Sequence, residues 1–224
     1  MKSGRILKNA LYEQVARIGK AVASPKRLEL IEVLCQGAKS VEQLAIEVGI
    51  SIKLASAHLK ELKAARLVEG RREGRNIYYS LMDEQVAELW VMLRALSETR
   101  LLELQAAMKK LVARPEELYP VTGAELLAQA ESGEVTVIDV RPIEEFDTAH
   151  FPHARSLPLS ELKNRIKELP IDRPIVAYCR GPFCLMAKEA VALLREHGLQ
   201  AARVEEGVAE WRTHGLSVVC DVAH

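Results

Sequence analysis

Apolar residues in the first half of the chain recur every three to four positions, the period of a helix with one buried face. They predict a helix near the N-terminus, a second over residues 24–37, a short third one after Ser40, and a fourth that begins at Ser51. Two short runs with period two then surround Glu73 and Gly74, which indicates a β-hairpin. The first half is therefore expected to be mainly helical and to end in one hairpin.

A single apolar stripe continues through residues 83–111 and predicts one long helix. At 1.5 Å per residue such a helix is about 40 Å long, more than a domain of about 90 residues can cover. We therefore expect the stripe to pack against the same helix of a second subunit, which would make the protein a homodimer. Pro115 and Pro120 end this helix and indicate a linker at about residues 113–120.

The second half of the chain alternates strand and helix signals. The strands are expected at VTVIDV, ARSLPL, PIVAYC and AARVEE, and the helices near residues 122–132, 160–168, 184–197 and 207–214. Thr122 and Glu125 have the spacing of a capping box. Such alternation indicates a parallel sheet with flanking helices. The sequence thus predicts two domains, a mainly α domain over residues 1–114 and an α/β domain over residues 115–224.

The charge of the chain differs between these two halves. Residues 1–114 hold 20 lysines and arginines against 13 acidic residues, whereas residues 115–224 hold 11 against 18. A basic half joined to an acidic half suggests different partners, with the basic half touching a polyanion. No apolar run approaches about 18 residues and the N-terminus lacks a signal-peptide core, so we expect a cytoplasmic protein without a membrane partner.

Helix, turn, helix and basic hairpin, in that order, are the layout of a winged helix-turn-helix, whose second helix enters the major groove of DNA. That helix is the one that begins at Ser51, and the hairpin tip would meet phosphates or a minor groove. The residues expected to face DNA are Lys53, Ser56, Ala57, His58 and Lys60 on the helix and Arg71, Arg72 and Arg75 on the hairpin.

The stretches SPKRLELIEVL, SVEQLAIEVGIS and SAHLKELKAARLVEGRREGRNIYYSL carry a resemblance to a known family. Together with the long helix that follows, they resemble the ArsR/SmtB family of bacterial repressors over about residues 5–112. The resemblance implies a homodimer on a palindromic double-stranded DNA operator, usually a repressor that its inducer releases.

The sequence departs from the family at the positions where its members sense metals. Metal-sensing members carry Cys-Val-Cys before the recognition helix, where this chain has Ser40-Val41-Glu42, and others use Asp and His pairs on the final helix, which here contains no histidine. Cys35 has no second thiol nearby and is expected to be a small buried hydrophobe, since metal sites need three or four ligands. We expect neither a metal site nor a cofactor.

The segment YCRGPFCLMA places two of the four cysteines five positions apart, between a strand and a helix. Backbone N–H groups of the loop, including those of Gly181 and Phe183, and of the helix N-terminus are expected to form an anion cradle. Such a cradle would lower the pKa of Cys179 and make it a nucleophile near neutral pH. Arg180 is the one cation of the loop, and Cys184 is the second thiol.

The segments VIDVRPIEEF, AHFPHARSLPL, IVAYC with its loop, and EEGVAEWRTHGLSV resemble a rhodanese domain over about residues 118–219. The resemblance implies that Cys179 accepts a sulfane sulfur and holds it as a persulfide. Asp139 and Arg141 match the family's Asp-Val-Arg, more often a structural pair than catalytic groups. Two further matching residues are expected to serve packing, Trp211 and His150.

The loop itself departs from active rhodaneses, which commonly carry a cation five positions after the cysteine. Cys184 occupies that position, and Pro182 and Phe183 make the loop stiffer and more apolar. This weakens the case for turnover of anionic thiosulfate and favours a sensor in which Cys184 resolves a modified Cys179. A packing role for Cys184 stays open, and Cys220 is expected to be incidental.

The hypothesis from sequence is a dimeric repressor whose rhodanese domain senses a sulfane-sulfur donor or an oxidant through Cys179 and Cys184. The alternative is a sulfurtransferase enzyme that carries a DNA-binding domain. A third class, arsenate reduction, is disfavoured because Leu185 stands where related oxyanion cradles have an arginine.

Overall fold

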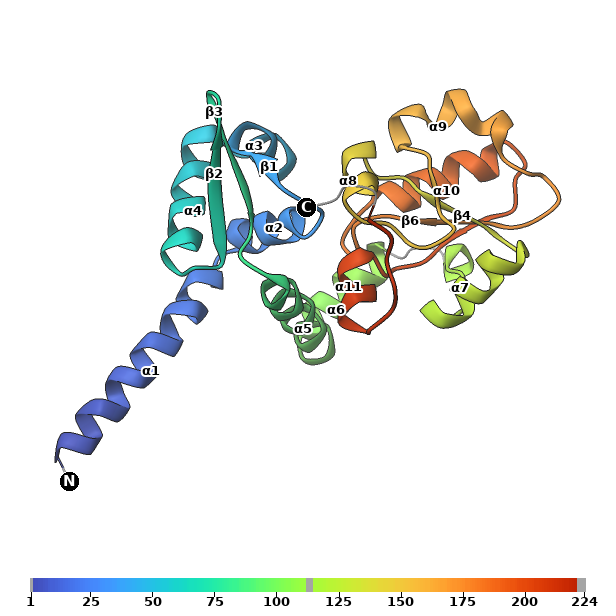
Figure 1. Cartoon of the computed structure of the whole chain (residues 1–224). Coiled ribbons are helices and arrows are strands. Elements are labelled where there is room, and N and C mark those ends of the chain that lie inside the picture. The colour runs from blue at the N-terminus through green and yellow to red at the C-terminus, as the bar shows by residue number, and fades with distance from the viewer. Residues whose placement is uncertain (1, 112–114, 221–224) are drawn as a thin grey trace. The chain divides into compact units, whose positions relative to one another are not determined.

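The computed structural model describes residues 2–111 and 115–220, and the chain divides into two compact units, Met1–Trp90 and Val91–His224. Helices and strands carry the labels of Figure 1. The predicted domain boundary at residue 114 follows the two family resemblances and stays a prediction.

The N-terminal unit is the predicted series of helices closed by a hairpin. Its elements are α1 (Lys2–Val22), α2 (Pro25–Leu34), β1 (Lys39–Ser40), α3 (Val41–Val48), α4 (Ile52–Ala64), β2 (Val68–Glu73), β3 (Asn76–Leu81) and the beginning of α5 (Glu84–Arg100). The three strands form an antiparallel sheet in the order β1-β3-β2. The two-residue strand β1 was not predicted, because so short a segment carries no periodicity.

Serine side chains fix where the two helices of the helix-turn-helix begin. Ser40 accepts a hydrogen bond from the N–H of Gln43, whose side chain in turn accepts from the N–H of Ser40, and this capping box starts α3. Ser51 accepts from the N–H of Leu54 at the start of α4. Apolar side chains of the helices then form the core, among them Leu30, Ile31, Leu34, Leu44, Ala55, Leu59 and Leu62.

The long helix predicted over residues 83–111 is two helices, α5 (Glu84–Arg100) and α6 (Leu102–Leu111). The side chain of Gln105 explains the interruption, because its amide donates to the backbone carbonyls of Glu98, at 2.9 Å, and Thr99, at 3.5 Å. A side chain that takes helix carbonyls in place of backbone N–H groups breaks the regular ladder. Of the predicted linker, residues 113 and 114 lie outside the described residues.

The C-terminal unit contains the four predicted strands. Its further elements are η1 (Pro115–Glu117), α7 (Gly123–Ser132), β4 (Thr136–Asp139), α8 (Ile143–Thr148), β5 (Arg155–Ser156), α9 (Leu159–Arg165), η2 (Ile166–Glu168), β6 (Ile175–Tyr178), α10 (Met186–Glu196), β7 (Ala201–Arg203) and α11 (Val208–Thr213). The strands form a parallel sheet in the order β5-β4-β6-β7. The predicted α/β class and the Thr122 capping box are confirmed, whereas α8 was missed.

Helices cover both faces of this sheet, α9 and α10 on one side and α7 and α11 on the other (Figure 1). Successive residues of β4 and β6 therefore point into different halves of the core, as strand geometry requires. Ile138 and Ala177 pack toward α9 and α10, while Val137 and Val176 pack toward α7 and α11. Strand β6 ends at Tyr178, directly before the first cysteine of the loop.

Candidate functional site

Helix α4 exposes the side that was predicted to face DNA. Leu59 and Leu62 are buried on the opposite side. Of the residues predicted to face DNA, three are exposed, namely Lys53, Ala57 and Lys60. Ser56 and His58 are half-buried. The helix thus presents a short polar surface of positive charge, which suits a polyanion.

The hairpin tip carries three exposed arginines, Arg71, Arg72 and Arg75. Arg71 lies 2.5 Å from the carboxylate of Glu73, and Arg72 donates to the carbonyl of Gly74 at 3.3 Å. The ion pair is exposed and therefore weak. Phosphate oxygens can accordingly compete for these guanidinium groups.

Cys179 and Cys184 lie against each other in the loop between β6 and α10, and both are free thiols. The Cys179 thiol donates a long hydrogen bond to the backbone carbonyl of Cys184, with 3.7 Å between Sγ and O. Cys179 is buried, whereas Cys184 is half-buried just before the helix. The loop therefore holds two thiols at the N-terminus of α10, as its sequence suggested.

The pKa values of the two thiols shift in opposite directions. The pKa of Cys184 is lowered to about 6, chiefly by a hydrogen bond from the Cys179 thiol, then by the N–H groups of Arg180 and Met186. The pKa of Cys179 is raised well above its ordinary value by its hydrogen bond to Cys184 and by burial. The net shift of the Cys179 pKa is therefore opposite to the expected one: the N–H groups of Gly181 and Ala187 do lower it, but the hydrogen bond to Cys184 and burial outweigh them. The direction of both shifts thus favours ionisation of Cys184 over that of Cys179.

Arg180, the cation of the loop, forms a bidentate ion pair with Glu145 of α8. Its Nη2 lies 2.6 Å from Oε1 and its Nε 3.0 Å from Oε2, and the Glu145 side chain is buried. Paired carboxylate and guanidinium charges largely cancel for a third group nearby. Arg180 therefore offers little net charge to an anion in the cradle. Sequence reasoning missed Glu145, and its place in the VIDVRPIEEF stretch was the available signal.

Two glycines allow the loop to adopt its conformation. Gly181 has a φ of 146°, which other residues rarely adopt. At Gly207 an added Cβ would lie 2.4 Å from the carbonyl oxygen of Arg180. The loop is thus packed backbone to backbone against the residues that precede α11, and no side chain fits between them. Gly207 was also missed from the sequence.

The other rhodanese-like residues are structural, as expected. Asp139 and Arg141 form a fully buried ion pair with 2.5 Å between Oδ2 and Nη2, and Arg141 also donates to the carbonyl of Ala149. Trp211 is buried and stacks on Phe151. In the same way, the buried ring of His150 stacks on that of Phe146.

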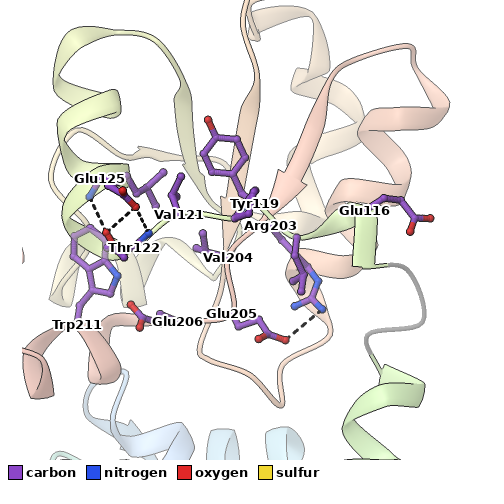
Figure 2. A pocket seen from close by; sticks show the side chains of 14 residues that line it. Glu116, Tyr119, Val121, Thr122, Glu125, Arg203, Val204, Glu205, Glu206 and Trp211 are labelled. Carbon is purple, nitrogen blue, oxygen red and sulfur yellow. Dashed lines mark hydrogen bonds and ion pairs between the residues drawn. The ribbon is translucent and has the colours of Figure 1, made fainter.

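A cavity of about 750 Å³ lies elsewhere in the C-terminal unit. Figure 2 shows Tyr119 and Arg203 on its wall, with Glu205 beside Arg203. Within the described residues, none of its lining comes from the cysteine loop. The cavity therefore does not serve the chemistry predicted for the thiols.

The described part of the chain offers neither a metal centre nor a membrane span. Within residues 2–111 and 115–220, no three His, Cys, Asp or Glu side chains gather as a metal site would require. Cys35 is half-buried at the end of α2. Over the same ranges, no helix has the length and apolar character needed to cross a bilayer.

Comparison with known proteins addresses both units. Residues 24–70 match the model of the arsR family of bacterial regulatory proteins, and residues 122–214 match the rhodanese-like domain. The HTH-type transcriptional regulator Rv0324 of Mycobacterium tuberculosis is 44% identical over 211 residues, which cover 94% of this chain and 92% of that protein. The chain belongs to the ArsR family of transcriptional regulators. Within this family, the present regulator carries a rhodanese-like domain in the same chain, and the predicted fold class is confirmed.

Other relatives match one unit of the ArsR-family regulator at a time. A sulfurtransferase of Allochromatium vinosum is 31% identical over 91 residues, which cover 40% of this chain and 83% of that protein. A solution structure from Mycobacterium bovis, described as a homodimeric winged helix-turn-helix DNA-binding domain, is 42% identical and covers 43% of this chain and 89% of its own, with a TM-score of 0.41.

Proposed function

We propose that this ArsR-family regulator is a homodimeric repressor that leaves its operator when a reactive sulfur species or an oxidant modifies the Cys179–Cys184 pair. The observation that carries the proposal is the contact between the two thiols at the start of α10, where the pKa of Cys184 is about 6. A thiolate with a second thiol beside it is the arrangement of thiol-based sensors. Such a repressor acts in the cytoplasm, where bacterial DNA lies.

The homodimer is supported by apolar side chains that the single chain leaves exposed. On α1 these are Ile6, Leu7, Leu11 and Val15, each more than 60% exposed. Leu96 of α5 and Leu102 of α6 are exposed by 56% and 74%. A contiguous apolar helix face in contact with water favours burial against a second copy.

The proposed chemistry reverses the order of attack expected from sequence. The Cys184 thiolate attacks a sulfur of a polysulfide, an S–S bond forms at Cys184, and the S–S bond of the polysulfide breaks to release hydrosulfide or a shorter polysulfide. The Cys179 thiol then attacks Sγ of the Cys184 persulfide anion, its proton passes to the outer sulfur, and that sulfur leaves as hydrosulfide. Two thiols are oxidised to a disulfide, and the polysulfide sulfur is reduced to sulfide.

A second candidate function is that of a sulfurtransferase enzyme, favoured by the similarity to the Allochromatium protein. Thiosulfate is a dianion, and in this loop Arg180 is already paired with Glu145. The site therefore lacks the net positive charge that would draw the donor in. Cyanide-dependent thiocyanate formation by the full-length protein distinguishes enzyme from sensor, since only an enzyme makes many thiocyanates per chain.

Operator release tests the sensor directly. Polysulfide is added to the full-length protein on its operator, and bound DNA and the mass of each cysteine peptide are followed together. Cys179→Ser and Cys184→Ser should each prevent the disulfide and most of the release, while Cys220→Ser, at an exposed cysteine, should behave as the parent. A double Cys179→Ser and Cys184→Ser variant that still releases DNA like the parent would overturn the proposal.

A further inference from the structure

A second buried ion pair lies beside the cysteine loop, between Arg94 of α5 and Glu210 of α11, both in the C-terminal unit. Arg94 Nη1 is 2.7 Å from Glu210 Oε1, and the two side chains are only 5% and 3% exposed. Burying two charges is costly, and a hydrophobic pair of similar size often stabilises a protein as well. This pair therefore calls for a role besides stability.

The pair lies against the loop at two residues between the cysteines. A Cβ on Gly181 would lie 3.2 and 3.3 Å from the carboxylate oxygens of Glu210 and 3.4 Å from Nη1 of Arg94. The Arg94 guanidinium also stands over the ring of Phe183, 5.8 Å from its centroid, which suits a cation–π contact. A shift of the loop backbone at either residue must displace Arg94 or separate it from the loop.

The other side of the pair is fixed. The second oxygen of Glu210 accepts a hydrogen bond of 2.7 Å from the N–H of Gly207, whose backbone packs directly against Arg180. Glu210 is therefore anchored by the same turn that supports the loop. Arg94 belongs to a helix that begins at Glu84 and so also passes through the last residues of the N-terminal unit. Its Nε also pairs with Glu98 of the same helix at 3.0 Å, so Arg94 moves with the helix.

We infer that Arg94 is a positioning residue that transmits the state of the cysteine loop to helix α5. The inference rests on the proposed function and names its regulatory link. With both thiols reduced, Gly181 and Phe183 hold Arg94 in its pair with Glu210. A Cys179–Cys184 bond tightens the loop between these cysteines and moves Gly181 and Phe183 away from Arg94. Helix α5 then loses its contact with the loop. Disulfide formation changes DNA affinity through Arg94 only if the reduced loop and the oxidised loop differ in their contact with Arg94.

The test uses the full-length double variant Arg94→Met with Glu210→Gln. It removes both charges of the pair at once, and the glutamine carbonyl can still accept from Gly207. Glu98, which lies 3.0 Å from Nε of Arg94 in the parent, loses this ion-pair partner but is 29% exposed and stays in contact with water. The variant should bind the operator and form the disulfide as the parent does, but the polysulfide-induced loss of DNA affinity should shrink about tenfold. The matched control is Arg165→Met with Glu161→Gln, an exposed pair of the same unit, which should respond as the parent.

Thermodynamic linkage provides a second measurement, and its result should not change if Arg94 has only a structural role. If disulfide formation weakens operator binding, operator binding must disfavour the disulfide by the same factor. In a glutathione redox buffer, saturating operator should shift the parent's dithiol–disulfide equilibrium constant about tenfold toward the dithiol and should not shift that of the double variant.

The outcomes separate the two proposals. A parent that forms no disulfide or keeps its DNA refutes the proposed function itself. A parent that responds, beside a double variant with the same response and the same redox shift, refutes the role of Arg94 alone. If the double variant fails to fold, Arg94→Lys takes its place, because it keeps the charge but lacks the planar group that stands over Phe183. A lysine variant with the full parental response also refutes that role.

Discussion

Two cysteines on one short loop differ in chemistry because they occupy different positions relative to the core and to a helix end. Cys179 follows a buried strand, and its hydrogen bond to Cys184, with burial second, stabilises its neutral thiol. Cys184 precedes α10, so that same hydrogen bond and nearby N–H groups stabilise its thiolate. Residue type and spacing alone do not tell these two environments apart.

Alkylation should therefore occur first at Cys184. With a pKa of about 6, Cys184 is mostly thiolate at pH 7, and its reaction with iodoacetamide should slow as the pH falls below about 6. Cys179 should react slowly at pH 7 in the parent, where Cys184 raises its pKa. Peptide mapping by mass spectrometry at several pH values measures both rates. Preferential labelling of Cys179 at pH 7 would contradict the assignment.

The charge of the loop is a second property decided by single residues. Glu145→Gln removes the carboxylate that binds Arg180 and should leave the cradle more positive. We expect thiosulfate-dependent thiocyanate formation to rise about tenfold, the effect of about 1.4 kcal/mol in transition-state binding, and stability to fall by about 3 kcal/mol. Glu144→Gln, at the exposed neighbour, is the control. Unchanged turnover in a folded Glu145→Gln variant would show that pairing does not limit thiosulfate use.

At the scale of elements, local signals in the sequence predicted helix starts and strands but not the interruption of a helix. Ser40, Ser51 and Thr122 cap helices with the bonds their spacing predicts. The stripe over residues 83–111 gave no warning of the break at Leu101, since Gln105 reaches carbonyls that an uninterrupted helix would have satisfied itself. Glu145 was equally hidden, because its partner lies 35 positions away in the chain.

The recognition helix and the hairpin should contribute differently to DNA binding. Replacing Arg71, Arg72 or Arg75 by Ala should weaken binding to all DNA sequences. The slope of log affinity against log salt concentration should fall in magnitude by about 1 for each phosphate that is no longer neutralised. Lys53→Ala should instead reduce the preference for the operator over other sequences. Fluorescence anisotropy at several salt concentrations measures both effects, with Arg165→Ala as an arginine control. A hairpin variant with the parental salt slope would show that its arginine does not bind a phosphate.

At the scale of the whole molecule, the chain joins a winged helix-turn-helix to a rhodanese-like domain, and both resemblances were recognisable from short motifs. What motifs could not supply was the link between them. Arg94 lies in a helix that the sequence assigned to dimerisation, and its partner Glu210 is 116 positions away. Interactions of such separation are set by tertiary packing and leave no periodic trace.

Dimerisation is the property of the whole molecule most easily tested. Leu11→Glu places a charge on the exposed apolar face of α1 and should yield monomers with at least about tenfold weaker operator binding, since burying a lone carboxylate is unfavourable. Ile171→Glu, at an apolar residue that is 89% exposed in the other unit, should change neither property. Sedimentation velocity reports the mass, and a dimeric Leu11→Glu variant would place the interface elsewhere.

The pairing of Arg180 with Glu145 also decides how the regulator should behave when a bacterium changes its osmotic surroundings. DNA occupancy by a basic surface varies with internal potassium, because bound protein displaces counterions. A thiol site whose nearby cation is already paired has little net positive charge, so ionic strength should change its reaction with an uncharged peroxide only weakly. Osmotic stress would then alter how much of the regulator occupies its operator, while the thiol reactivity of the DNA-free regulator stays the same.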